Sequence, residues 1–305
     1  MRDVVIALAP TFLFSVWLYG WQALMVTAVS VAACMIFEYF IGRVLLKKTN
    51  TLGDWSAAVT GVLLAFNLPA DISPWLVVLG ALVAIGVGKM SFGGLGNNIF
   101  NPALVGRVFL LISFPVQMTV FPASPTIDAV TGASPLQMLR AAVKRGVPVD
   151  EAFAGVDMLD LMEGFKTGSL GEMASILLIA GGIFLLARKV ITWHIPVFVL
   201  GSIALFTCIP WLADPVHFAS PLFHLFTGGA ILGAVYMATD YVTSPMSKAG
   251  MAVYGIGIGL ITVLIRFWGA YPEGVSFAIL IMNAVVPLIN MYVKPRRFGK
   301  VAKSK

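Results

Sequence analysis

The stretch ALMVTAVSVAACMIFEYFI, residues 23–41, decides the fold class of this chain. Its only charged residue is Glu38, which lies near its end. An α-helix rises about 1.5 Å per residue, so about 20 apolar residues cross the hydrocarbon core of a bilayer, which is about 30 Å thick. The run is apolar throughout, whereas a membrane-spanning β-strand alternates between apolar and polar residues. The stretch therefore predicts a transmembrane helix.

Other apolar runs of the same character lie along the whole chain. The predicted helical cores are 4–19, 23–41, 56–68, 75–87, 103–114, 174–186, 195–211, 222–237, 251–267 and 275–293. We therefore expect an all-α polytopic membrane protein with about ten transmembrane helices.

The composition supports this fold class. The 305-residue chain is 59% hydrophobic and 11% charged, and its mean hydropathy is +0.94. Soluble domains are typically about 45–50% apolar and about 25% charged, so lipid must cover much of this chain. The net charge of +6 does not indicate nucleic-acid binding, because the basic residues lie between apolar runs and at the C-terminus. Membrane lipid, and no nucleic acid, is the expected partner.

Two cysteines, Cys34 and Cys208, lie inside apolar runs. No CxxC pair and no Cys/His cluster accompanies them, so we expect no metal or iron–sulfur site built by this chain alone. They are interpreted as packing residues. The alternative is that each supplies one ligand to a cluster shared with another subunit.

The distribution of lysine and arginine predicts the orientation of the helices. With the N-terminus in the cytoplasm, 14 basic residues lie on the cytoplasmic side and 4 on the opposite side. The cytoplasmic set is Arg2, Arg43, Lys47, Lys48, Lys89, Arg188, Lys189, Lys248, Lys294, Arg296, Arg297, Lys300, Lys303 and Lys305, and the opposite set is Arg140, Lys144, Arg145 and Lys166. Because cytoplasmic loops are rich in Lys and Arg, both termini are expected on the cytoplasmic side of a bacterial cell (inner) membrane.

The long segment 115–172 then lies outside the cytoplasm and divides the chain into four parts. These are a first membrane repeat (1–114), an extracytoplasmic loop (115–172), a second membrane repeat (173–293) and a basic cytoplasmic tail (294–305). Five helices in each half give the two halves opposite orientations. The third and eighth helices are interrupted, and interrupted helices at matching positions of an inverted repeat indicate a binding site near the membrane midplane.

Arginine and glutamate inside apolar runs are costly in hydrocarbon. Arg107 and Arg266 are therefore expected to face the bundle interior or an interface, although Arg266 could instead extend toward water near its helix end. Glu38 could be an ion site, or it could reach water beside Arg43.

The sharpest local motif is DAVTGASP, residues 128–135. Its Gly and Pro indicate a turn, and Ser134 could cap a helix that begins near Pro135. The same stretch resembles the flavinylation motif D-x-x-(S/T)-G-A-(S/T). That resemblance implies that a flavin transferase joins FMN to the last hydroxyl by a phosphoester.

On this resemblance Ser134 carries the covalent FMN, and Thr131 is the competing hydroxyl. Gly132 and Ala133 would leave the hydroxyl unhindered, and Asp128 would orient the segment or contact the transferase. Most members of the resembled family have threonine at the attachment position. A serine phosphoester is chemically equivalent, and a subunit that has lost its flavin stays open as an alternative.

Three further segments carry a wider resemblance: GGLGNNIFNPA (93–103), TDYVTSP (239–245) and GAYPEGVSFA (269–278). They resemble the D subunit of the Rnf complex and, less well by chain length, the related B subunit of the sodium-pumping NADH:quinone reductase. The resemblance implies a urea-transporter-like fold of two inverted five-helix repeats. It also implies a second, non-covalent flavin, riboflavin, for which the candidate lining residues are Asn101, Arg107, Thr239 and Asp240.

The function implied by the resemblance is that of a membrane subunit in an ion-translocating ferredoxin:NAD oxidoreductase. The A, B, C, E and G subunits of the complex would be its partners, and the coupling ion could be Na⁺ or H⁺. No side chain of this chain is expected to be catalytic, because the flavin carries out the redox chemistry. The rival from another class is a small-solute channel of urea-transporter-like fold, since a fold does not determine a function.

Overall fold

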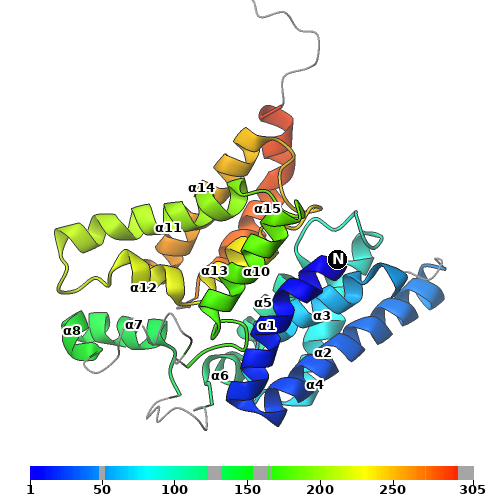
Figure 1. Cartoon of the computed structure of the whole chain (residues 1–305), viewed down its shortest axis with the longest axis horizontal. Coiled ribbons are helices and arrows are strands. Elements are labelled where there is room, and N and C mark those ends of the chain that lie inside the picture. The colour runs from blue at the N-terminus through cyan, green and yellow to red at the C-terminus, as the bar shows by residue number, and fades with distance from the viewer. Residues whose placement is uncertain (48–51, 123–131, 154–163, 165–166, 272, 295–305) are drawn as a thin grey trace, which may run out of the picture.

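A computed structural model of the chain describes residues 1–47, 52–122, 132–153, 164, 167–271 and 273–294. All regular elements within these residues are helices, as predicted (Figure 1). The longer helices are α1 (Arg2–Tyr19), α2 (Trp21–Phe40), α3 (Ser56–Phe66), α4 (Pro74–Leu82), α5 (Pro102–Ser113), α7 (Pro135–Arg145), α10 (Ser175–Ala187), α11 (His194–Ala213), α14 (Lys248–Trp268) and α15 (Val275–Tyr292). The short ones are α6 (Pro115–Thr119), α8 (Val149–Ala152), α12 (Pro221–Phe226) and α13 (Ala230–Leu232), with π-helical η1 (Ile41–Leu45), η3 (Val83–Val87) and η5 (Gly233–Met237) and the 3-10 turns η2 (Leu52–Asp54) and η4 (Met90–Phe92).

Each predicted apolar run coincides with helix. Among the described residues, six segments are long and apolar enough to cross a membrane: Arg2–Tyr19, Trp21–Leu45, Pro74–Phe92, His194–Ala213, Lys248–Trp268 and Val275–Tyr292. The shorter apolar helices are α3, α5 and α10. The chain is therefore a multi-pass membrane protein.

The eighth apolar run, 222–237, is interrupted, as predicted, and the interruption lies within the run. It breaks between α12 and α13 at Gly228 and Gly229, whose φ angles of 68° and 63° lie in the left-handed region. The Arg266 guanidinium donates to the carbonyls of His224 and Thr227 at the end of α12, at 2.5 and 2.8 Å. These bonds satisfy carbonyl groups that a broken helix leaves without partners, which a membrane interior requires.

The main helix contacts recur in the two halves of the chain. In the first half α2 contacts α3 and α4, and α4 contacts α5; in the second half α11 contacts α12 and α14, and α14 contacts α15. Across the halves α1 packs on α10 and α5 packs on α15. Figure 1 shows α1 and α10 side by side where the two halves of the chain, which we call the two lobes, meet.

Glycine allows the closest helix contacts in both lobes. A Cβ on Gly61 of α3 would lie 2.6 Å from the Cα of Val31 on α2, and the Ser30 hydroxyl donates to the Gly61 carbonyl at 2.7 Å. In the second lobe the Ser202 hydroxyl of α11 donates to the Gly255 carbonyl of α14 at 3.3 Å. Small residues and hydroxyl bonds are the usual means by which helices associate in lipid.

The segment between the lobes forms a separate small layer. The sequence of this segment favours short helices at 136–143 and 157–165. The first lies in α7, whereas the second falls almost wholly outside the described residues. Leu136 and Leu139 of α7 pack with Ala219 and Phe223 in a cluster of their own. Arg140 fastens α7 to the α14–α15 connection by donating to the carbonyls of Gly269 and Ala270.

Candidate functional site

Ser134 is the N-cap of α7, as the turn interpretation of its motif predicted. Its hydroxyl accepts from the Gln137 amide at 3.4 Å, and the Gln137 side chain accepts from the Ser134 amide at 3.0 Å. This reciprocal pair is a capping box. The hydroxyl lies at the positive end of the helix, where backbone N–H groups favour anions. Ser134 is only 2% exposed, so the described chain closes over it.

The backbone before Ser134 is held against two neighbouring segments. The Phe121 amide donates to the Gly132 carbonyl at 3.0 Å, and a Cβ on Gly132 would lie 2.7 Å from the Phe121 carbonyl oxygen. The Thr167 hydroxyl donates to the Ala133 carbonyl. The close approach of the Phe121 backbone therefore requires glycine at position 132 of the motif. Asp128 and Thr131, the other two motif positions, lie outside the described residues.

A small polar pocket of about 10 Å³ lies beside the Ser134 cap, and we call it the outer pocket. Its polar lining is Arg107, Thr119, Gln137, Tyr271 and Glu273. Arg107 forms an ion pair with Glu273 and donates to the Ser276 hydroxyl. Gln137 also donates to the Thr119 carbonyl at 2.9 Å.

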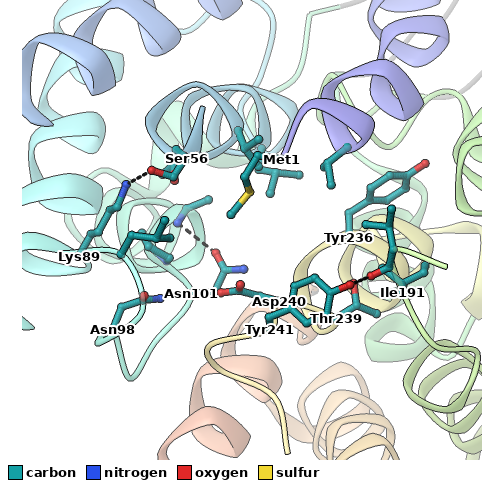
Figure 2. A pocket seen from close by; sticks show the side chains of 18 of the residues that line it. Met1, Ser56, Lys89, Asn98, Asn101, Ile191, Tyr236, Thr239, Asp240 and Tyr241 are labelled. Carbon is teal, nitrogen blue, oxygen red and sulfur yellow. Dashed lines mark hydrogen bonds between the residues drawn. The ribbon is translucent and has the colours of Figure 1, made fainter. Parts of the chain in front are cut away.

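A larger pocket of about 130 Å³, the inner pocket, lies on the side that the charge distribution assigns to the cytoplasm (Figure 2). Asn101, Thr239 and Asp240 line it, so the fold brings together three of the four candidate residues for the second flavin. Arg107 does not line this pocket and lies instead in the outer one.

The three residues differ in their free hydrogen-bonding capacity. Asn101 caps α5 by accepting from the Ala103 and Leu104 amides and donates to the Met237 carbonyl at 3.1 Å. The Thr239 hydroxyl donates to the Val235 carbonyl at 2.6 Å. The Asp240 carboxylate accepts long bonds from the Val242 amide and the Thr243 hydroxyl, at 3.5 and 3.4 Å, and also interacts with the Asn98 side chain. A carboxylate has about four acceptor sites, so Asp240 keeps some of them available for a ligand.

Asp240 follows η5 and lies outside the candidate membrane spans. Burial raises the pKa of this carboxyl above its ordinary value, and the backbone amide of Val242 only partly opposes that effect. Figure 2 shows Asp240 beside Asn101, within the cavity.

Lys89, which lines the inner pocket, forms a buried ion pair with Glu38 that sequence reasoning missed. The Lys89 ammonium donates to the Glu38 carboxylate at 2.5 Å and to the Ser56 hydroxyl at 2.6 Å. Both charged residues are 1% exposed. Lys89, which the charge count assigns to the cytoplasmic side, is therefore buried, and the alternative that Glu38 reaches water beside Arg43 is wrong. A lone acid inside an apolar run was the signal that a buried basic partner was required.

Arg107 and Arg266 are each 6% exposed, which confirms that both face the bundle interior. Arg266 does not extend to water, because the backbone carbonyls at the α12 break hold its guanidinium. Cys34 is buried and Cys208 is partly buried, and both are free thiols.

Comparisons with known proteins place this architecture in a family. Residues 1–299 match the model of the NQR2, RnfD, RnfE family. The chain is 41% identical over 303 residues to the D subunit of the proton-translocating ferredoxin:NAD(+) oxidoreductase complex of Clostridium ljungdahlii, covering 98% of this chain and 91% of that one. It is 42% identical over 301 residues to the D subunit of the Na(+)-translocating ferredoxin:NAD(+) oxidoreductase complex of Acetobacterium woodii, covering 98% and 90%.

A more distant relative is the D subunit of the ion-translocating oxidoreductase complex of Escherichia coli O17:K52:H18, 35% identical over 334 residues, with 98% of this chain and 93% of that one covered. These matches extend through both lobes and the α7 segment between them. The chain therefore belongs to the NQR2, RnfD, RnfE family.

Proposed function

We propose that this chain is the D-type membrane subunit of an ion-translocating ferredoxin:NAD oxidoreductase of the Rnf type. The observation that carries the proposal is the match of almost the whole chain to relatives named as the D subunit of such complexes. The relative from the complex named as proton-translocating is 41% identical to this chain, and the relative from the complex named as Na(+)-translocating is 42% identical. Overall identity therefore favours neither ion.

The arrangement of the two lobes supports an inverted repeat of ten membrane helices. The contacts of α2 with α3 and α4 and of α4 with α5 have counterparts in those of α11 with α12 and α14 and of α14 with α15, and the contacts between the halves, α1–α10 and α5–α15, join helices at equivalent positions. Lys89 and Arg266 are buried basic residues near the ends of the fourth and ninth apolar helices. We infer that both termini are cytoplasmic and that α7 lies on the opposite side, since the charge asymmetry favours that orientation.

Ser134 is proposed to carry FMN through a phosphoester outside the cytoplasm, attached by a flavin transferase. The cap geometry fits a phosphate: the ester oxygen can still accept an amide hydrogen, and the N-terminus of α7 stabilises negative charge. The burial of Ser134 means that the cap must open for attachment. FMN would supply the electron-carrying chemistry, and the chain would position it.

The inner pocket is proposed to hold the second, non-covalent flavin. Apolar walls from residues such as Val59, Leu63 and Val235 surround a few polar groups, which is the usual character of a cofactor site. Asp240 and Asn98 would orient the flavin, whereas Asn101 would act mainly by holding α5 and Met237 in place. This arrangement is a reason to prefer a redox subunit over a solute channel.

Intact-mass measurement tests the attachment. Full-length protein co-expressed with a flavin transferase should gain one FMN, and Ser134→Thr should retain it. Ser134→Ala removes both the hydroxyl and the cap, which costs about 1 kcal/mol at a typical N-cap. Ser134→Asn is therefore the matched variant, because it keeps a capping side chain but cannot form the ester.

Loss of FMN from Ser134→Ala and Ser134→Asn, with retention in Thr131→Ala, is the expected pattern. FMN retained in Ser134→Asn but lost in Thr131→Ala would place the attachment at Thr131. Wild-type protein without added mass would refute the covalent flavin altogether. Flavin released by denaturing the Ser134→Ala protein would report the inner-pocket ligand separately.

A further inference from the structure

Four buried charged side chains lie beneath the Ser134 cap, with acids and bases alternating. Arg107 pairs with Glu273, and the carboxylates of Glu273 and Glu172 both interact electrostatically with Arg266. Arg107 and Arg266 are 6% exposed, Glu172 is 3% exposed and Glu273 is 8% exposed. Two positive and two negative charges leave the set formally neutral.

This charge set lies directly against the start of α7. Gln137, which forms the capping box with Ser134, shares the outer pocket with Arg107 and Glu273. A Cβ placed on Gly228 would touch both Leu136 and the Arg266 guanidinium. Leu136, in the first turn of α7, therefore lies close to Arg266. Gln137 therefore links the attachment hydroxyl to the pocket that Arg107 and Glu273 line.

The Arg107 side chain is the charge best placed to act on such a group. It faces the outer pocket, it is more than nine-tenths buried, and its Nε has no hydrogen-bond partner among the described residues. A charge excluded from water is screened much less than a surface charge and acts over a longer distance. Replacing either member of the Arg107–Glu273 pair alone would leave an uncompensated charge of known sign.

We propose that Arg107 and Glu273 tune the reduction potential of the flavin carried by Ser134, with opposite signs. This inference rests on the covalent FMN proposed above. Arg107 stabilises the negative charge that the flavin gains on reduction, and Glu273 opposes it. Arg107 is thereby assigned to the outer flavin rather than to the ligand of the inner pocket, where Lys89 is the buried base.

The test is a potentiometric titration of the full-length flavinylated protein, monitored by flavin absorbance. The same titration of Ser134→Ala, which should lack the covalent flavin, supplies the signal to subtract. Arg107→Gln should lower the potential of the covalent flavin, and Glu273→Gln should raise it. A unit charge about 12 Å away, at an effective dielectric constant of about 20, changes an equilibrium constant about tenfold. For a one-electron couple this is a shift of about 59 mV.

Two further variants separate charge from packing. Arg107→Lys keeps the charge and should stay close to the wild-type potential. The double variant Arg107→Gln/Glu273→Gln removes both charges, so it should fold more readily than either single variant and should also lie near the wild-type value.

Shifts of the same sign in Arg107→Gln and Glu273→Gln would overturn the inference, as would unchanged potentials in variants that still carry FMN. If Arg107→Gln changes only the reduction potential of the flavin that remains in Ser134→Ala protein, Arg107 acts on the ligand of the inner pocket, and the inference is likewise refuted. Wild-type protein without covalent FMN is a different failure, because it removes the proposed function itself.

Discussion

Removing the Lys89 ammonium should destabilise the protein more than any surface substitution. Lys89 and Glu38 are 1% exposed, and their charged groups are 2.5 Å apart. Lys89→Met keeps a side chain of similar length but leaves the Glu38 carboxylate buried without its counter-charge. The Ser56 hydroxyl also loses its contact with the ammonium.

The expected loss follows from the burial of the pair. Breaking a buried ion pair by removing one partner costs about 3–5 kcal/mol, whereas replacing both partners with apolar residues is often neutral or stabilising. At about 2 °C per kcal/mol, Lys89→Met should lower the melting temperature by roughly 6–10 °C. The double variant Glu38→Met/Lys89→Met should recover most of that loss.

Melting of the detergent-solubilised proteins at one fixed scan rate provides the measurement, because membrane proteins often unfold irreversibly. Exposed Lys248→Met is the matched control and should melt like the wild type. The reasoning is refuted if Lys89→Met melts within about 2 °C of the wild type, or if the double variant melts no higher than the single variant.

Three further predictions concern packing, orientation and pH. Gly61→Ala should cost about 1–3 kcal/mol of stability because its Cβ would meet the α2 backbone at Val31, while Gly201→Ala, which has open space around it, should be neutral or slightly stabilising in the same melting assay. The orientation can be tested in a variant lacking Cys34 and Cys208. A cysteine in place of the exposed Lys144 should react with an impermeant thiol reagent in intact cells, whereas a cysteine in place of Met246, which is 87% exposed, should react only after lysis. The reverse pattern would invert the topology. Because folding raises the pKa of the Asp240 carboxyl above its ordinary value of 3.8, the stability that its protonated form contributes is present below pH 3.8 and is lost as the pH rises through the folded-state pKa. Asp240→Asn, which cannot ionise, should therefore exceed the wild type in melting temperature by more at pH 7 than at pH 4. A difference that does not change with pH would contradict this.

The sequence by itself determined the elements and the family. Apolar runs of membrane length identify helices because the bilayer demands local backbone hydrogen bonding, and this requirement is visible in consecutive residues. The cap at Ser134 was equally predictable, since a Ser-Pro step before a helix is a local signal. An interruption of the eighth helix was predicted without a position, although the adjacent Gly228 and Gly229 in an apolar stretch could have located it.

Only the tertiary structure decided which charges meet. Glu38 and Lys89 are 51 residues apart and Arg107 and Glu273 are 166 residues apart, so no local pattern reports either pairing. For the same reason the sequence could group Asn101, Thr239 and Asp240 with Arg107, but the fold divides them between two pockets. A helix such as α5 presents its start and its middle to different neighbours along its length, and the packing of the two lobes determines which pocket each residue enters.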